Sequence, residues 1–252
     1  MRAYRPWLAI TLGVVVLVFW QLISVSGAVA EYFLPAPTHI IDSLITSIRH
    51  AGMLGYAWIT LREAILGCML AFTGALPLAL ALFHWPLFSQ TVLPYVAASQ
   101  AIPAIAIAPL LVLWVGYGLF PVVLLCAFMV FFPITISILL GLRSINRDVI
   151  EAARLDGAGG FKMIIYMELP LATPAILAGL RTGMTLSITG AVVGEMTMGG
   201  TGLGMVLASQ RDAVNTAGLF ATIVVLSVMA TALHGLIHAC EKRSRTIAAI
   251  QS

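Results

Sequence analysis

Long hydrophobic runs dominate the sequence and set its expected architecture. Runs close to the ~20 residues that a helix needs to cross a bilayer fall at 7–28, 61–83, 93–115, 119–141, 171–194 and 217–240. Their apolar residues do not alternate with polar ones, as they would in membrane-spanning strands. The pattern therefore predicts an all-α membrane protein, with residues 1–252 forming a single transmembrane domain of about six spanning helices.

Composition points to lipid as the solvent for most of the chain. Of the 252 residues, 61% are hydrophobic and 9% are charged, and the mean hydropathy is +1.05. Soluble domains carry about 25% charged residues, so this chain has too few charges to cover a folded surface in water. The net charge is only +3 and the basic residues form short clusters, which indicates membrane orientation rather than nucleic-acid binding.

The distribution of lysine and arginine predicts the orientation of the spans. If both termini are cytoplasmic, nine basic residues lie inside and three lie outside, which agrees with the excess of positive charge on the cytoplasmic side of membrane proteins. The inside set is Arg2, Arg5, Arg143, Arg147, Arg154, Lys162, Lys242, Arg243 and Arg245, and the outside set is Arg49, Arg62 and Arg211. We therefore expect a multi-pass protein whose loop 144–170 faces the cytoplasm.

The first hydrophobic run allows two interpretations. Arg2 and Arg5, the apolar run from Trp7, and Ala28–Ala30 before Glu31 resemble a secretory signal peptide with its cleavage site. The run is longer than the ~7–15 residues of a signal-peptide core, and five further runs follow it. We interpret it as an uncleaved first span.

The loop 144–170 is the longest stretch that is both polar and helical in pattern. Asp148 and Glu151 stand three residues apart, the spacing of a capping box, which predicts the start of a short helix. Asp156 and Gly157 are expected to end it, because glycine tolerates the left-handed conformation common after a helix C-terminus.

A second short helix is expected at Phe161–Tyr166, with Leu169–Pro170 ending it before the fifth span. Ala152 and Ala153 leave one face of the first helix nearly bare, so another protein could approach its backbone closely. Glu151 beside them offers an orienting charge. The loop is thus either a knob for a groove on a cytoplasmic partner or an ordinary interfacial loop.

The spacing within this loop resembles the EAA motif of permease subunits of bacterial ATP-binding-cassette (ABC) importers. The matching residues are Glu151-Ala152-Ala153, Gly157, Met167 and Leu169-Pro170. Met167 replaces the usual isoleucine of the motif, a substitution that nearly conserves volume. Other segments resemble the nitrate, sulfonate, taurine and thiamine-precursor branch of this family. These are Leu34-Pro35-Ala36-Pro37-Thr38, Pro103, Pro109-Leu110, Trp114, Gly116, Gly118, Phe131-Phe132-Pro133 and Gly202-Leu203-Gly204.

The resemblance implies the type I importer permease fold in a bacterial inner membrane, and a translocation pathway for a small solute. The implied solutes are sulfonates, taurine, nitrate or thiamine precursors. The implied partners are an ATP-binding subunit at the loop 144–170, an external solute-binding protein and a second permease copy forming a homodimer. The coupling residues carried over are Glu151, Ala152, Ala153, Asp156, Gly157, Leu169 and Pro170.

The sequence predicts no enzymatic activity and no cofactor in this chain. A phosphate-binding loop of the P-loop type needs a Gly-Lys pair followed by Ser or Thr. The two lysines, Lys162 and Lys242, follow Phe161 and Glu241 instead. By the family resemblance, ATP and magnesium would be bound by the partner subunit.

Arg181 is the most polar feature inside a predicted span. A charge at the centre of a span costs at least ~2.5–3.5 kcal/mol on insertion scales, so it usually has a partner or a watery path. Arg181, Thr185, Thr189 and Glu195 are candidates for a translocation path, with Arg181 attracting an anionic solute. The favoured alternative is that Arg181 extends to the lipid headgroups. Glu195 precedes the glycine-rich segment 199–204, which is either a gate at the outer mouth or a plain external loop.

His234 and His238 stand four residues apart on the last span, where helix–helix hydrogen bonding is a better interpretation than a metal site. Cys68, Cys126 and Cys240 lie far apart in apolar runs and suggest neither a disulfide nor a metal. A stand-alone ion-coupled carrier remains the alternative function. The absence of internal repeats and of carboxylates near the middle of the spans argues against it. A membrane enzyme would need a nucleophile–base pair that the sequence does not suggest.

Overall fold

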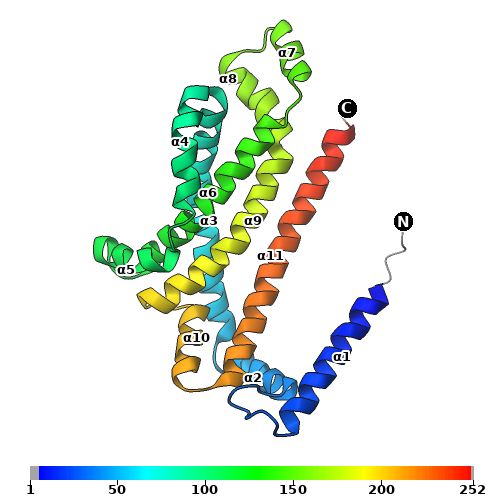
Figure 1. Cartoon of the computed structure of the whole chain (residues 1–252), viewed down its shortest axis with the longest axis vertical. Helices are drawn as coiled ribbons and strands as arrows, with labels where there is room; N and C mark the ends of the chain where they lie inside the picture. Colours follow the sequence, from blue (N-terminus) through cyan, green and yellow to red (C-terminus); the bar gives the residue numbers. More distant parts are fainter. Residues whose placement is uncertain (1–5, 251–252) are drawn as a thin grey trace.

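The computed structural model describes residues 6–250, and the regular elements in this part of the chain are all helices (Figure 1). In chain order they are α1 (Pro6–Val25), α2 (Pro37–His50), α3 (Met53–His84), α4 (Pro86–Ser99), α5 (Ala104–Val115), α6 (Leu119–Arg143), α7 (Arg147–Leu155), α8 (Gly160–Met163), the π-helical turn η1 (Ile164–Glu168), α9 (Leu169–Met198), α10 (Leu203–Asp212) and α11 (Thr216–Ile250). The all-α class predicted from the hydrophobic runs is confirmed.

Within the described residues, four stretches are long and apolar enough to cross a membrane: α3, α6, the unbroken run Gly160–Met198, and α11 over Thr216–Ala239. The pair α4 and α5 would add a fifth if it forms one broken span. The first predicted run corresponds to the apolar helix α1. The third run is not a straight span, because α4 and α5 meet at an angle of 95°. Proline disfavours helical geometry in the residue before it and lacks an N–H, so the chain breaks ahead of Pro103.

Glycine lets the three central helices α3, α6 and α9 pack closely. A Cβ atom on Gly67 of α3 would lie 2.2 Å from the Cβ of Cys126 on α6. On α9, a Cβ on Gly179 or Gly183 would approach the side chains of Ser137 or Ile134 of α6 to 2.7 Å. The Gly179-x-x-x-Gly183 spacing therefore serves helix packing within the chain, as small residues do at helix crossings in membranes.

Short helices mark the two ends of the central bundle (Figure 1). α7 and α8 lie at one end, together with the C-terminal part of α11, whereas α2 and α10 lie at the opposite end. α2 was not anticipated from the sequence, because its 14 residues mix polar and apolar side chains. Ile41, Ile45 and Ile48 form an exposed apolar stripe on it, as in helices that lie flat at a membrane interface.

Candidate functional site

The helix α7 begins two residues earlier than the predicted capping box. Its N-cap is Asn146, whose side-chain oxygen accepts a hydrogen bond of 2.9 Å from the Asp148 N–H. The prediction that Asp148 and Glu151 form the cap is therefore wrong, because asparagine is an equally good N-cap residue. Asp148 instead sits in the first turn, where its negative charge is favourable to the helix dipole.

The end of α7 follows the prediction. Gly157 has φ +85°, the left-handed conformation expected after a helix C-terminus. The Ala158 N–H donates to the Ala153 carbonyl at 2.9 Å, and the Gly157 N–H donates to the Arg154 carbonyl at 3.0 Å. These two bonds form a Schellman motif, which satisfies carbonyl groups that the helix end leaves free.

The second part of the loop is joined to the next span without a break. The prediction that Leu169–Pro170 ends a short helix is wrong, because helical structure continues from Gly160 to Met198. The wider π-helical turn η1 precedes Pro170, which occupies the first turn of α9, where its missing N–H is tolerated. Glu168 at the end of η1 lies 3.2 Å from His84 Nε2, and this contact joins the turn to the end of α3.

The surface of the loop 144–170 combines small, charged and exposed apolar side chains. Glu151 and Ala152 are exposed on α7, whereas Ala153 is buried. Leu155 is 90% exposed and Phe161 is 75% exposed. Large apolar side chains with this much exposure at a polar end of a bundle are typical of a surface that another protein covers.

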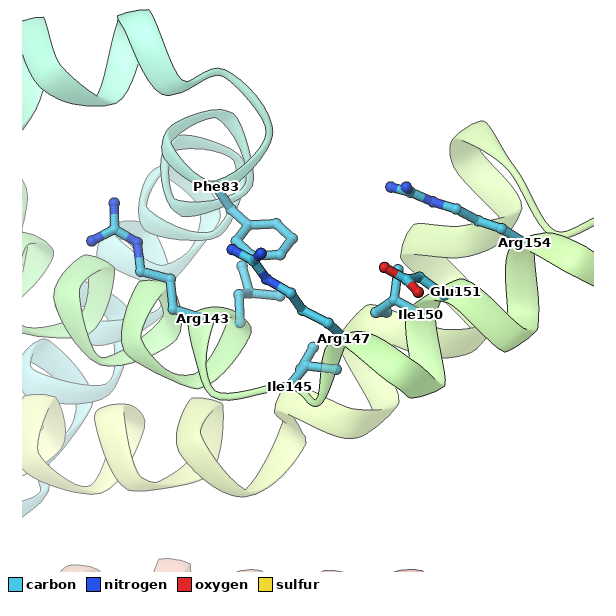
Figure 2. A pocket seen from close by; sticks show the side chains of 8 residues that line it. Phe83, Arg143, Ile145, Arg147, Ile150, Glu151 and Arg154 are labelled. Carbon is cyan, nitrogen blue, oxygen red and sulfur yellow. The ribbon is translucent and has the colours of Figure 1, made fainter.

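A cavity of about 400 Å³ lies between α7 and the ends of α3 and α6. Figure 2 shows Arg147, Glu151 and Arg154 extending from α7 beside it, with Phe83 and Arg143 across from them. Ser89 accepts a 3.0 Å hydrogen bond from the Arg143 guanidinium. Arg147, Glu151 and Arg154 have no ion pair with the rest of the described chain, so their charges are available to a partner.

The structure places Arg181 in contact with the last span. Its guanidinium lies 3.0 Å from Glu241 Oε2 and 2.9 Å from His238 Nδ1, both on α11. Glu241 is buried and the Arg181 side chain is 24% exposed. His238 therefore takes part in a helix–helix contact, the interpretation that the sequence favoured for it.

The other predicted pathway residues do not form one continuous surface with Arg181. Thr185 donates a 3.2 Å hydrogen bond to the Arg181 carbonyl within α9, and Thr189 is exposed. Glu195 is buried near the opposite end of the helix. The structure thus separates Arg181, beside α11, from Glu195, beside α10.

Glu195 caps the N-terminus of α10 together with a residue of α3. The Gly204 N–H donates to Glu195 Oε2, and the Leu203 N–H donates to Thr60 Oγ1 at 2.8 Å. These are the first two N–H groups of α10, which have no acceptor within their own helix. The segment 199–204 is therefore fastened to the bundle by side chains of two other helices.

Glu63 of α3 is a buried acid that the sequence reasoning missed. It is 3% exposed, and its Oε2 has no hydrogen-bond partner among the described residues. Glu63 is the third residue of the predicted run 61–83, close to its start rather than at its middle. This acid could have been found from the sequence, because Glu63 is a charged residue within the apolar run 61–83.

Comparison with known proteins identifies the family. Residues 63–246 match the family described as "Binding-protein-dependent transport system inner membrane component". The chain is 37% identical over 234 residues to the riboflavin transport system permease protein RibX of Chloroflexus aurantiacus, covering 91% of this chain and 87% of the relative. It is 31% identical to the formylaminopyrimidine transport permease protein ThiX of Halalkalibacterium halodurans, with 90% of each chain covered. It is 28% identical to the taurine transport system permease protein TauC of Escherichia coli, covering 92% of this chain and 86% of the relative.

The fold is also found among solved structures. An inward-facing structure of the MetNI methionine ABC transporter matches with a TM-score of 0.70 at 18% identity, covering 76% of this chain and 95% of that one. The type I importer permease fold predicted from the resemblance is thus confirmed. The chain is a multi-pass membrane protein that belongs to the binding-protein-dependent transport system inner membrane components, the permease subunits of ABC transporters.

Proposed function

We propose that this chain forms the translocation pathway of an ABC importer and couples it to a separate ATP-binding subunit at the loop 144–170. The observation that carries the proposal is the exposed surface of the loop 144–170, with Glu151, Ala152 and Leu155 on α7 and Phe161 on α8. A groove with an apolar floor and a rim that carries both acidic and basic groups would suit this surface, because Arg147 and Arg154 lie on either side of Glu151 along α7. ATP and magnesium would bind to that subunit.

The remaining partners would use other surfaces of the bundle. The loop 144–170 and the C-terminal part of α11 share one end, which supports a cytoplasmic location for both (Figure 1). An external solute-binding protein would then dock at the opposite end, near α2 and α10. A second permease copy, forming a homodimer, would complete the pathway in the lipid bilayer, with both termini of each chain in the cytoplasm.

The solute is proposed from the range that the relatives carry. Their names give riboflavin, formylaminopyrimidine and taurine, and the branch resemblance adds sulfonates and nitrate. Most of these are small and either heterocyclic or anionic. The solute-binding protein would select among them before delivering one to this chain.

Uptake by reconstituted vesicles tests the proposed function. The permease, the ATP-binding subunit and the solute-binding protein encoded beside it would be placed together in proteoliposomes with labelled candidate solutes. We expect uptake of one solute class that requires ATP and all three proteins. Uptake by the permease alone, driven by an ion gradient without ATP, would instead establish the ion-coupled carrier.

Arg181→Gln tests whether the arginine serves the solute or the fold. The change removes the guanidinium from buried Glu241, and breaking a buried ion pair costs about 3 kcal/mol at the lower end of its range. We expect a lower thermal unfolding midpoint for the purified chain. The double variant Arg181→Gln/Glu241→Gln should recover most of the midpoint and of the uptake, because both charges are then absent.

Arg211→Gln is the matched control, since Arg211 forms its 2.9 Å ion pair with Asp212 on an exposed surface. Exposed pairs contribute about 0–1 kcal/mol, so little change is expected. A double variant that regains stability but not uptake would mean that Arg181 acts on the solute. That result would support the hypothesis that Arg181 belongs to the translocation path.

A further inference from the structure

The third hydrophobic run is broken between the two ends of the bundle. α4 ends at Ser99, α5 begins at Ala104, and the two helices meet at 95°. Figure 1 shows α5 extending to the side, between the end that carries α7 and the end that carries α2. The backbone carbonyls of Gln100, Ala101 and Ile102 accept no hydrogen bond from the described part of the chain. The break therefore leaves polar backbone groups without partners inside the predicted span.

This polar break opens onto a cavity. Non-helical backbone at membrane depth is tolerated where protein covers it or where it lines a water-filled space, but not against lipid. A cavity of about 330 Å³ lies at the break, lined by Ser99, Gln100 and Pro103 and by Phe128 and Phe132 of α6. Discontinuous helices of this kind form the substrate sites of many secondary transporters. The break thus has the features of a solute site.

A larger cavity of about 620 Å³ adjoins the first. The two share Ile102, Phe128 and Phe132 in their linings, and Trp114 and Phe131 line the larger one. Small-molecule sites have volumes of about 300–1,000 Å³ and are mostly apolar, with a few polar groups that orient the ligand. Together the two cavities supply an aromatic part and a polar part of that kind.

The aromatic rings are arranged to hold a flat ligand. The ring centroids of Phe128 and Phe132 lie 6.2 Å apart with an angle of 90° between the ring planes, and those of Phe131 and Phe132 lie 4.9 Å apart at 81°. A planar ring stacked on Phe128 would therefore stand at right angles to Phe132. Offset stacking and edge-to-face contact are both favourable for aromatic rings.

The cavities offer nothing that would neutralise an anion. None of the residues that line them is charged. Arg181, the cation that the sequence suggested for an anionic solute, pairs with Glu241 of α11 and lines neither cavity. Moving a sulfonate or nitrate ion from water into such a site costs its hydration without a compensating charge. The free carbonyls at the break are hydrogen-bond acceptors, so they favour a ligand with N–H donors.

We propose that the two cavities form one solute site, which takes an uncharged planar heteroaromatic ring bearing N–H groups. The ring lies against Phe128 and Phe132, and its N–H groups face Gln100 and the free carbonyls of the break. Of the solutes proposed above, the heterocyclic ones fit this site and the anionic ones do not. As a site on the transport path, it rests on the function proposed above.

Binding of labelled solutes to the purified full-length permease in lipid nanodiscs tests the site without ATP, partner proteins or uptake. The heteroaromatic probes are riboflavin and formylaminopyrimidine, and the anionic probes are taurine and nitrate. We expect saturable binding of at least one heteroaromatic probe and of neither anionic probe. Binding of an anionic probe as tight as that of the heteroaromatic ones overturns the proposal, and so does the absence of saturable heteroaromatic binding.

Phe128→Leu tests the aromatic contact, because leucine keeps an apolar side chain and removes the ring. We expect binding of the heteroaromatic probe to weaken about two- to tenfold, the effect of one aromatic pair. Phe120→Leu is the matched control, since Phe120 also lies on α6, is 58% exposed and lines neither cavity. Equal affinities for the two variants would overturn the proposal. If Phe128→Leu does not fold, the comparison of probes on the unaltered chain still decides.

Gln100→Leu tests the polar part of the site. Loss of one hydrogen bond should weaken binding about two- to tenfold, whereas Gln90→Leu, at an exposed position of α4 that lines neither cavity, should bind normally. Unchanged binding in Gln100→Leu would refute the assignment of the polar edge.

The uptake experiment described above separates this inference from the proposed function. Heteroaromatic binding without ATP-driven uptake would leave the site standing and refute the function. ATP-driven uptake of a sulfonate or nitrate, with no heteroaromatic binding, would confirm the function and refute the site. A loss of dimers in Phe128→Leu with unchanged binding would assign this face to the second permease copy, and that result would also refute the site.

Discussion

Gly157→Val is expected to abolish ATP-driven uptake and co-purification of the ATP-binding subunit. Gly157 holds φ +85°, and left-handed backbone costs a residue with a Cβ about 1–2 kcal/mol, more when the side chain is β-branched. The strain would undo the Schellman motif that ends α7 and turn Glu151 away from its partner. Each 1.4 kcal/mol of lost docking energy lowers the affinity about tenfold.

Gly159→Val provides the matched control. Gly159 lies two residues away with φ −155°, an extended conformation open to valine, and a Cβ there meets no atom within 4 Å. Co-purification and uptake should be unchanged in this variant. Glu151→Ala removes the orienting charge and should weaken both. Full assembly and full coupled uptake in Gly157→Val and Glu151→Ala would refute the docking role of the loop.

Gly67→Leu is expected to prevent stable folding of the bundle. Even the first side-chain carbon would lie 2.2 Å from the Cys126 Cβ and 3.0 Å from the Val123 carbonyl oxygen, so α3 and α6 would have to separate. Overpacking of a core costs about 1–3 kcal/mol, and a leucine between two helix backbones should exceed that range. The measurement is the thermal unfolding midpoint and the yield of monodisperse protein in detergent.

Gly55→Leu is the control on the same helix. A Cβ atom at Gly55 meets nothing within 4 Å, and the residue is exposed near the start of α3. The same substitution should therefore leave the unfolding midpoint unchanged or slightly higher, because leucine is the better helix former. Equal midpoints for the two variants would mean that α3 and α6 do not pack closely at Gly67.

The sequence predicts those features of the fold that depend on local patterns. A spanning helix needs only a sufficient apolar run, so α6 starts at Leu119 as expected and ends within two residues of the prediction. The end of α7 depends on Gly157 alone and was likewise predictable. The start of α7 was misjudged because Asn146 and Asp148 are competing caps, and only the fold decides between them.

Features that depend on distant contacts were not predictable. Pro103 and Pro109 favour a kink in the third run, but a bend as large as 95° requires the surrounding helices to accommodate a broken span. A proline within a span, such as Pro77 of α3, often causes no break. The Leu203 N–H donates to Thr60 Oγ1, which lies 143 positions earlier in the chain, so no spacing rule connects the two residues. The sequence indicates that Arg181 needs a partner, but it does not indicate that the partner is Glu241.

The unbroken helical run Gly160–Met198 has a mechanical consequence. At about 1.5 Å per residue its 39 residues form a lever nearly 60 Å long. The loop 144–170 lies at one end of this run. Glu195 lies near the other end, where it accepts a hydrogen bond from the N-terminus of α10. A tilt imposed on the first end by a moving partner reaches the second without crossing a hinge other than the turn η1. If the function proposed above holds, this run would carry a movement of the partner at the loop 144–170 to the N-terminus of α10 at the opposite end of the bundle.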